Sequence, residues 1–187
     1  MSTIISYHPG LQGTSAKHMQ TLVSRTGDSV YWSKIFKRSK DPTFLFLATL
    51  WYALYAWDEA FEVLFRYINA LVGCITFRAL YLFEHLCQEY NVLQSNNIKL
   101  TRELHKVQAH LLYYQQLLQD FLRSVEFVRD TPNPAMNAPS ISNTEREDSA
   151  TLLRTEAHNL ISEIERLTRQ REMLSNRLDN AIHLVRI

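Results

Sequence analysis

Apolar residues recur at helical spacing along most of the chain. Over about residues 43–90 they return at steps of three and four, which is the spacing of one face of an α-helix. Asp41 can cap this helix, and Pro42 suits its first turn, where the missing N–H needs no partner. The pattern therefore predicts a long first helix over about 43–90, with Gly73 as the expected bend or break.

Two later segments carry the stricter spacing of a heptad repeat, in which apolar positions alternate steps of four and three. They predict helices over about 96–129 and 144–186, separated by a loop over 130–143 whose three prolines a helix would not accommodate. The apolar positions of the first repeat are Leu100, Leu104, Val107, Leu111, Tyr114, Leu118, Phe121, Val125 and Val128. Those of the second are Leu153, Ala157, Leu160, Ile164, Leu167, Leu174, Leu178, Ala181 and Val185, with the charged Arg171 among them.

Two heptad helices joined by a loop most simply fold back as an antiparallel hairpin, with the first helix packed alongside. The predicted fold class is therefore all-α, an elongated three-helix bundle over residues 41–187 with long antiparallel heptad helices. Residues 1–40 hold three of the four glycines, lack sustained periodicity and end in a run of basic residues. They are predicted to form a flexible, irregular N-terminal arm.

Charge and cysteine usage narrow the function classes. The 20 Lys and Arg against 19 Asp and Glu leave a net charge of +1, so no overall field attracts nucleic acid. Cys74 and Cys87 lie in apolar helical pattern and are expected to be buried free thiols in a reducing compartment, with a disulfide between them as the alternative. The first twenty residues show no secretory pattern, so a cytoplasmic location is expected.

No motif for catalysis or for cofactor binding is recognisable, so no enzymatic activity is expected and no catalytic, cofactor-binding or metal-binding residue is assigned. The seven histidines do not fall at the spacing of metal ligands on one helix face. The acidic run Glu145, Glu147 and Asp148 stands at the start of the last helix, where negative charge complements the helix dipole. Weak binding of Mg²⁺ or Ca²⁺ by these carboxylates is the alternative.

Aromatic residues gather over 44–65, where they are expected to be core or interface anchors, with a ligand pocket as the alternative. The uncharged stretch Thr43–Trp57 is fifteen residues long, which at about 1.5 Å per residue is too short to cross a bilayer. A membrane-embedded helical hairpin over Thr43–Phe83 is kept as a further alternative. The aromatic residues are Phe44, Phe46, Trp51, Tyr52, Tyr55, Trp57, Phe61 and Phe65.

Three segments resemble, in order, the helical part of the cytoplasmic domain of CorA-type magnesium transporters, most closely the divergent fungal type. They are DPTFLFLATLWYALYAWDEAFEVL, LTRELHKVQAHLLYYQQLLQDFLRSVEFV and SEIERLTRQREMLSNRLDNAIHLV, the last similar to the stalk helix that leads into the pore. The family's Gly-Met-Asn signature and its transmembrane helices are missing, and its N-terminal α/β subdomain is hardly visible, so the chain looks cut at both ends. Asp58 and Glu59 fall near an acidic region of the family but are not assigned as ion ligands.

The resemblance implies a non-conducting soluble relative or fragment of a CorA-like divalent metal ion transporter that acts through helix–helix association. The expected partners are further copies of the chain or full-length CorA-like subunits, through which membrane contact would be indirect. No nucleic acid and no small-molecule substrate are expected. A single copy is expected to expose apolar surface that a partner covers. The alternative is an unrelated coiled-coil adaptor or scaffold protein.

Overall fold

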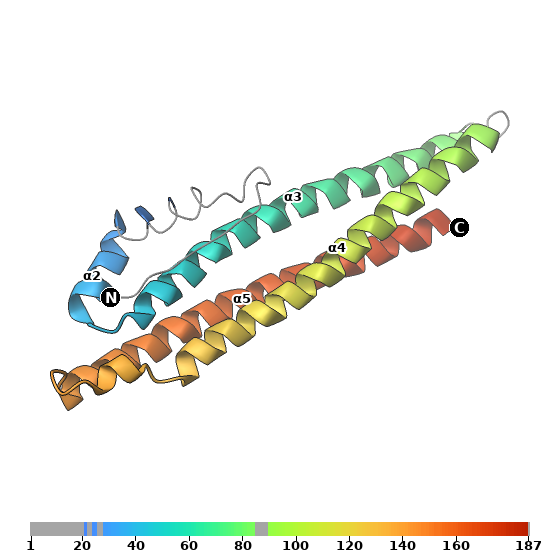
Figure 1. Cartoon of the computed structure of the whole chain (residues 1–187). Helices are drawn as coiled ribbons and strands as arrows, with labels where there is room; N and C mark the ends of the chain where they lie inside the picture. The colour runs from blue at the N-terminus through green and yellow to red at the C-terminus, as the bar shows by residue number, and fades with distance from the viewer. Residues whose placement is uncertain (1–20, 22–23, 26–27, 85–89, 187) are drawn as a thin grey trace. The chain divides into compact units, whose positions relative to one another are not determined.

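The computed structural model describes residues 21, 24–25, 28–84 and 90–186, with side chains described up to 75 and again over 99–184. These residues are all-helical, which confirms the predicted all-α class, and no strand occurs among them. The α-helices are α2 (Val30–Arg38), α3 (Thr43–Glu84), α4 (Tyr90–Asp130) and α5 (Asn143–Arg186), with a short 3₁₀ helix η1 (Pro134–Asn137) before α5 (Figure 1).

The first predicted helix begins where the sequence places it but ends earlier than expected. The backbone N–H of Thr43 donates to Asp41 Oδ1 at 2.9 Å, so the predicted cap is confirmed. α3 then runs through Gly73 without a break and ends at Glu84 rather than near residue 90. α4 starts at Tyr90 rather than near residue 96, so Ser95, Asn96 and Asn97 lie inside the helix.

The prediction of an irregular arm over residues 1–40 is wrong for its last part, while residues 1–20 lie outside the described residues. Val30–Arg38 forms α2, in which Trp32 and Ile35 are buried. The apolar side chains stand three residues apart on one helix face, whereas the basic residues that suggested a loop lie on the exposed face. A helix of only nine residues offered too short a pattern to recognise.

The described residues pack as two compact units, each built from segments of α3, α4 and α5: those up to Tyr55 with 124–161, and those over 56–123 with those from Ser162 onward. In the first unit, α2 and the residues after it run antiparallel to α5. Ser39 Oγ lies 2.8 Å from Ser149 Oγ, and Lys40 Nζ pairs with Glu145 Oε1 at 3.2 Å. At the other end of α2, the Tyr31 hydroxyl donates to the carboxylate of Glu156.

The proline-rich loop 130–143 is packed into the first unit. Met136 in η1 is buried. Asn133 accepts from the N–H of Ala135 at 3.0 Å, and its Nδ2 donates to Asp41 Oδ1 and to Thr43 Oγ1, each at 2.9 Å. The loop is therefore bonded to the cap that starts α3.

In the second unit, side-chain contacts show the direction in which each helix segment runs. Arg171 donates to Gln115 at 3.0 Å, and Gln108 donates to Asp179 at 3.1 Å. As the chain advances along α4, the partner on α5 moves backward, so α4 and α5 are antiparallel here. The remaining contacts of this unit join α3 to α4 and α3 to α5: Trp57 with Tyr114, Tyr67 with Glu103, Asp58 with Arg166, and Phe65 with Arg177.

The heptad positions form the buried interior of both units. Every position of the second repeat whose side chain is described is buried, including Arg171. In the first repeat Leu104, Val107, Leu111, Leu118 and Val125 are buried, and the others are half-buried. The predicted burial of the heptad positions is thereby confirmed for the second repeat and for most of the first.

Two further expectations concern the surface of α3. Cys74, predicted to be a buried thiol, is exposed, because it lies off the buried face that Ile68 and Ile75 occupy; Cys87 lies outside the described residues. Across 28–84 and 90–186, no helix has an apolar stretch long enough to span a bilayer.

Replacing Leu118 or Ile164 with Ala is expected to lower the free energy of unfolding by about 2 to 5 kcal/mol each, since both side chains are fully buried. Leu112→Ala on α4 is the matched control, because Leu112 is 63% exposed and should cost far less. Urea denaturation at equilibrium measures the difference, and equal midpoints for Leu118→Ala and Leu112→Ala would contradict this packing.

Candidate functional site

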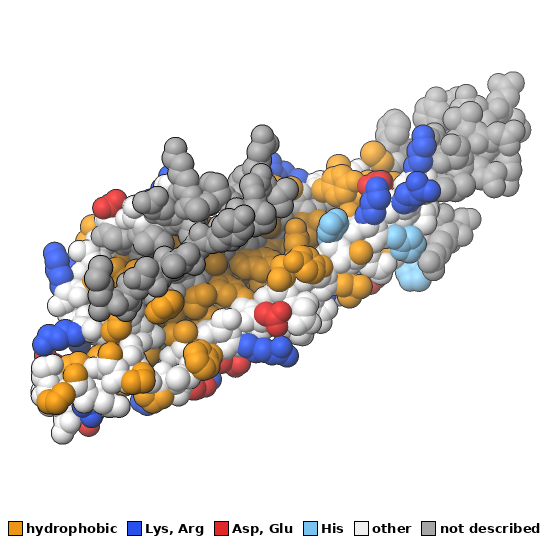
Figure 2. All heavy atoms as spheres, viewed as in Figure 1, with side chains coloured by type: hydrophobic (Ala, Val, Ile, Leu, Met, Phe, Trp, Pro, Cys, Tyr) orange, Lys and Arg blue, Asp and Glu red, His pale blue; other side chains and the backbone are white. Residues whose placement is uncertain are grey.

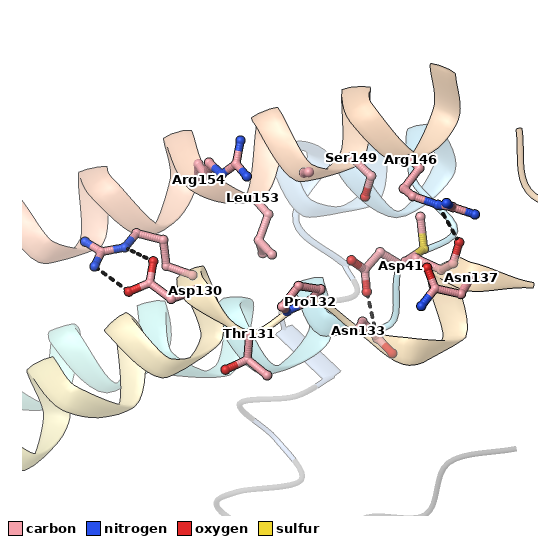
Figure 3. A pocket seen from close by; sticks show the side chains of 13 residues that line it. Asp41, Asp130, Thr131, Pro132, Asn133, Asn137, Arg146, Ser149, Leu153 and Arg154 are labelled. Atoms are coloured by element: carbon pink, nitrogen blue, oxygen red, sulfur yellow. Dashed lines mark hydrogen bonds and ion pairs between the residues drawn. The ribbon is translucent and has the colours of Figure 1, made fainter. Parts of the chain in front are cut away.

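A polar hollow of about 220 Å³ lies in the first unit, where the end of α4, the proline-rich loop and the start of α5 meet. Figure 3 shows Ser149 and Leu153 on α5 facing Asp41 and Pro132 across it. Its lining comprises Asp41, Arg129, Asp130, Thr131, Pro132, Asn133, Met136, Asn137, Arg146, Ser149, Ala150, Leu153 and Arg154.

Two charged groups of the polar hollow pair with each other at the end of α4, and a third bonds to the loop. Arg129 donates from Nε and Nη2 to the two carboxylate oxygens of Asp130, each at 2.7 Å. These hydrogen bonds lower the pKa of Asp130 and raise the pKa of Arg129. Arg146 Nε donates to the carbonyl oxygen of Met136 at 3.0 Å, which joins α5 to η1 (Figure 3).

Asp41 is the buried acid of this hollow. Its Oδ1 accepts from the N–H of Thr43 and from Asn133 Nδ2, and its own N–H donates to Ser39 Oγ at 3.2 Å. A carboxylate that accepts such bonds is committed to capping the helix and anchoring the loop. The arrangement is that of a structural junction between the start of α3 and the loop.

The acidic run at the start of α5 forms a helix cap. Glu145 Oε2 accepts from the N–H of Ser142 at 3.0 Å, and the N–H of Glu145 donates to Ser142 Oγ at 3.2 Å, which is a capping box. Ser142 and Lys40 together lower the pKa of Glu145, the backbone hydrogen bond of Ser142 being the largest cause. Glu147 and Asp148 are exposed. Within the described part of the chain, His, Cys, Asp and Glu side chains form no group of three or more that could hold a metal ion.

The other polar residues singled out from the sequence are dispersed. Asp58 Oδ1 pairs with Arg166 Nη2 at 2.7 Å, while Glu59 is exposed. This hydrogen bond is the largest cause that raises the pKa of Arg166. His105, His110, His158 and His183 are exposed, and His8, His18 and His85 lie outside the described residues.

α3 carries a second apolar face, which is exposed. The spacing of apolar residues in the sequence does not distinguish this exposed face from the buried one. Val63 is 55% exposed and Tyr67 43% exposed, and Ala70 and Cys74 are exposed as well. These four residues, the outer stripe, follow one another at steps of four, three and four, so they line one side of the helix. Hydrophobic side chains are also visible on the face of the molecule shown in Figure 2. A helix that is apolar on more than one side is typically covered on more than one side.

Comparison of the chain with protein-family models, curated proteins and solved structures gives no match. The resemblance of the three helical segments to CorA-type transporters therefore stays a prediction.

Glu145 is expected to make folding depend on pH in the acid range. Its pKa in the folded protein is held below the usual 4.5, so its stabilising effect is fully present above about pH 4.5 and is lost as the pH falls through the lower folded-state value. Glu145→Gln should flatten this part of the stability curve, measured by urea denaturation between about pH 7 and about pH 3. Adding Ser142→Ala to Glu145→Gln should change the pH dependence little further. Loss of stability on acidification that is unchanged in Glu145→Gln would contradict the capping role.

Proposed function

We propose that the chain is a helix-association module that packs against a second copy of itself through the outer stripe of α3. In this proposal it is a non-conducting relative or fragment of a CorA-like divalent metal ion transporter, with its long helices arranged as an elongated three-helix bundle. It acts in the cytoplasm, and it contacts the membrane only through partner subunits. The observation that carries the proposal is the exposed apolar stripe on a helix whose opposite side is already buried.

The outer stripe has the composition of a surface that is covered in an assembly. Exposed apolar patches of this kind mark interaction sites, because water around them is displaced favourably when a partner binds. Beside the stripe, Glu62 and Arg66 form an exposed pair with oxygen and nitrogen 3.6 Å apart. Charges of both signs next to an apolar strip suit a two-fold interface, in which the same surface meets itself.

The link to CorA-like proteins is supported by the order of the elements. The three segments that resemble the family lie in α3, α4 and α5, in the same order as in the family. The antiparallel contacts between α4 and α5 in the second unit agree with the hairpin that the two heptad repeats predict. Binding of Mg²⁺ by exposed carboxylates would be weak, since hard cations need several converging oxygen ligands.

The second candidate is an unrelated coiled-coil adaptor that binds helices of other proteins. The observation that favours it is the continuous burial of heptad positions along α5, which needs no relation to ion transport. The two candidates differ in their response to Mg²⁺, because only the transporter-derived protein is expected to change its assembly when the ion is added.

Size-exclusion chromatography with light scattering, without detergent and with or without millimolar Mg²⁺, tests the proposal. The expected mass is a multiple of the 21.9 kDa chain, and it is expected to shift with Mg²⁺. An oligomer indifferent to Mg²⁺ would favour the adaptor. A monomer under both conditions would overturn association through the outer stripe.

A matched pair of substitutions tests whether the outer stripe is the surface through which two copies associate. Ala70→Asp puts a charge in the middle of the outer stripe and is expected to reduce the mass to that of one chain, because burying an unpaired carboxylate is costly. Ala109→Asp, at an exposed alanine of α4 in the same unit, is expected to leave the mass unchanged. If both variants dissociate, or neither does, the outer stripe is not the interface.

A further inference from the structure

The first unit contains a second hollow, of about 350 Å³, whose walls are mostly aromatic. It lies among α2, the early part of α3 and α5. We call it the aromatic hollow, and its volume falls near the lower end of the range for small-molecule sites, about 300 to 1,000 Å³. Its lining comprises Ser29, Tyr31, Trp32, Trp51, Tyr52, Tyr55, Glu156 and Asn159.

One acid lies among these rings. Glu156 is 5% exposed, and it accepts a hydrogen bond from the Tyr31 hydroxyl. No Lys or Arg is among the described residues that line the hollow. Desolvation, followed by the hydrogen bond and the charge of Glu156, raises the pKa of Tyr31 to about 12, so the phenol stays neutral and keeps donating its proton. Glu156 is therefore the one ionisable acid among the described residues that line the aromatic hollow, and no Lys or Arg accompanies it there.

The rings that line the hollow contact one another in pairs at an angle, so they do not stack face to face. Tyr52 and Tyr55 have centroids 5.8 Å apart and planes inclined by 55°, and Tyr31 and Trp32 meet edge to face at 5.5 Å. The faces of such rings carry negative potential, which attracts a cation placed against them. Trp51 Nε1 is buried and has no hydrogen-bond partner among the described residues, so the lining also holds an unused donor.

We propose that the aromatic hollow binds an organic cation that carries a methylated ammonium group. Methyl groups spread the charge over an apolar surface, so the cation loses little hydration on entering and packs against several ring faces at once. The carboxylate of Glu156 supplies the opposite charge. A metal ion is a poorer guest, because hard cations require clustered oxygen ligands and the described residues of the lining offer one carboxylate. This site is independent of the outer stripe.

The same chemistry can come from a free choline-like molecule or from a methylated lysine in a peptide. Both present a quaternary or nearly quaternary nitrogen to the rings, and they differ in the chain attached to that nitrogen. Tetramethylammonium chloride contains only the shared group, so it is the first probe. Choline and a peptide with one trimethyl-lysine are then titrated separately. The ligand that binds with the lower Kd identifies the source of the cation.

The three tryptophans allow binding to be followed by the indole N–H signals in nitrogen–proton NMR. Trp32 and Trp51 line the aromatic hollow, whereas Trp57 belongs to the second unit and serves as an internal reference. Tetramethylammonium is expected to shift the Trp51 signal saturably and to leave that of Trp57 in place. Tert-butyl alcohol, which has nearly the same shape without the charge, should bind at least about tenfold more weakly.

Two substitutions separate the charge from the rings. Glu156→Gln keeps an acceptor for the Tyr31 hydroxyl but removes the charge, and it is expected to weaken tetramethylammonium binding about tenfold or more. Tyr55→Leu removes a ring that is 69% exposed, so the fold should survive while binding weakens severalfold. Tyr113→Leu is the matched control, because Tyr113 is similarly exposed at 59% but lies in the second unit. Circular dichroism verifies that each variant remains helical.

Several outcomes would overturn the proposal. They are the absence of a saturable Trp51 shift at about 100 mM tetramethylammonium, equal binding of tert-butyl alcohol, and undiminished binding to a folded Glu156→Gln protein. Binding that survives in Ala70→Asp would support a site separate from the association surface. Loss of binding in a helical Ala70→Asp protein would instead show that the cation needs the assembled state, which contradicts a site complete within one chain.

Discussion

Burial of the apolar seam along α5 is the interaction on which both units depend. Leu153, Ala157 and Leu160 are buried in the first unit, and Ile164 and Leu178 are buried in the second. An isolated amphipathic helix gains little from its backbone hydrogen bonds alone, so most of its stability comes from covering such a face. Each of the other helices is held because it covers part of this seam or packs on a helix that does.

The packing on α5 brings the polar groups of the first unit together, and their hydrogen bonds fix where α3 and α5 start. Asp41 caps α3 and at the same time receives Asn133 from the loop, so one carboxylate serves two chain segments far apart in sequence. Ser142 and Glu145 cap α5 without outside help, apart from the ion pair with Lys40. The junction is thus built from local caps that long-range contacts reinforce, and this explains why a proline-rich loop is packed rather than loose.

The seam of α5 could be predicted because it obeys one period without interruption, and the cap of α3 because Asp-Pro is a strong local signal. α2 was missed, since a short helix with basic residues on its outer face resembles a loop in composition. The outer stripe was missed because α3 is so apolar that the spacing of its apolar residues does not distinguish its exposed face from its buried one. For the same reason Cys74 was predicted to be buried, whereas it is exposed. The aromatic hollow could not be read from spacing, because Tyr31, Trp51 and Glu156 come together only when α2 and α3 pack on α5. The visible signal was the gathering of aromatic residues over 44–65, for which a ligand pocket was the alternative, because Trp51, Tyr52 and Tyr55 line the hollow.

Arg171 has a consequence for how α4 and α5 align along their axes. It is 8% exposed at a position where the rest of the seam is apolar, and its Nη1 reaches Gln115, while its Nε has no partner among the described residues. If α5 slid by one heptad, the guanidinium would face Gln108 or Leu122, and the bond from Gln108 to Asp179 would be lost. A uniformly apolar seam would tolerate such slipped registers almost equally well. The buried arginine gives up some stability, and because its bond to Gln115 forms together with the Gln108–Asp179 bond in one alignment, it favours that register.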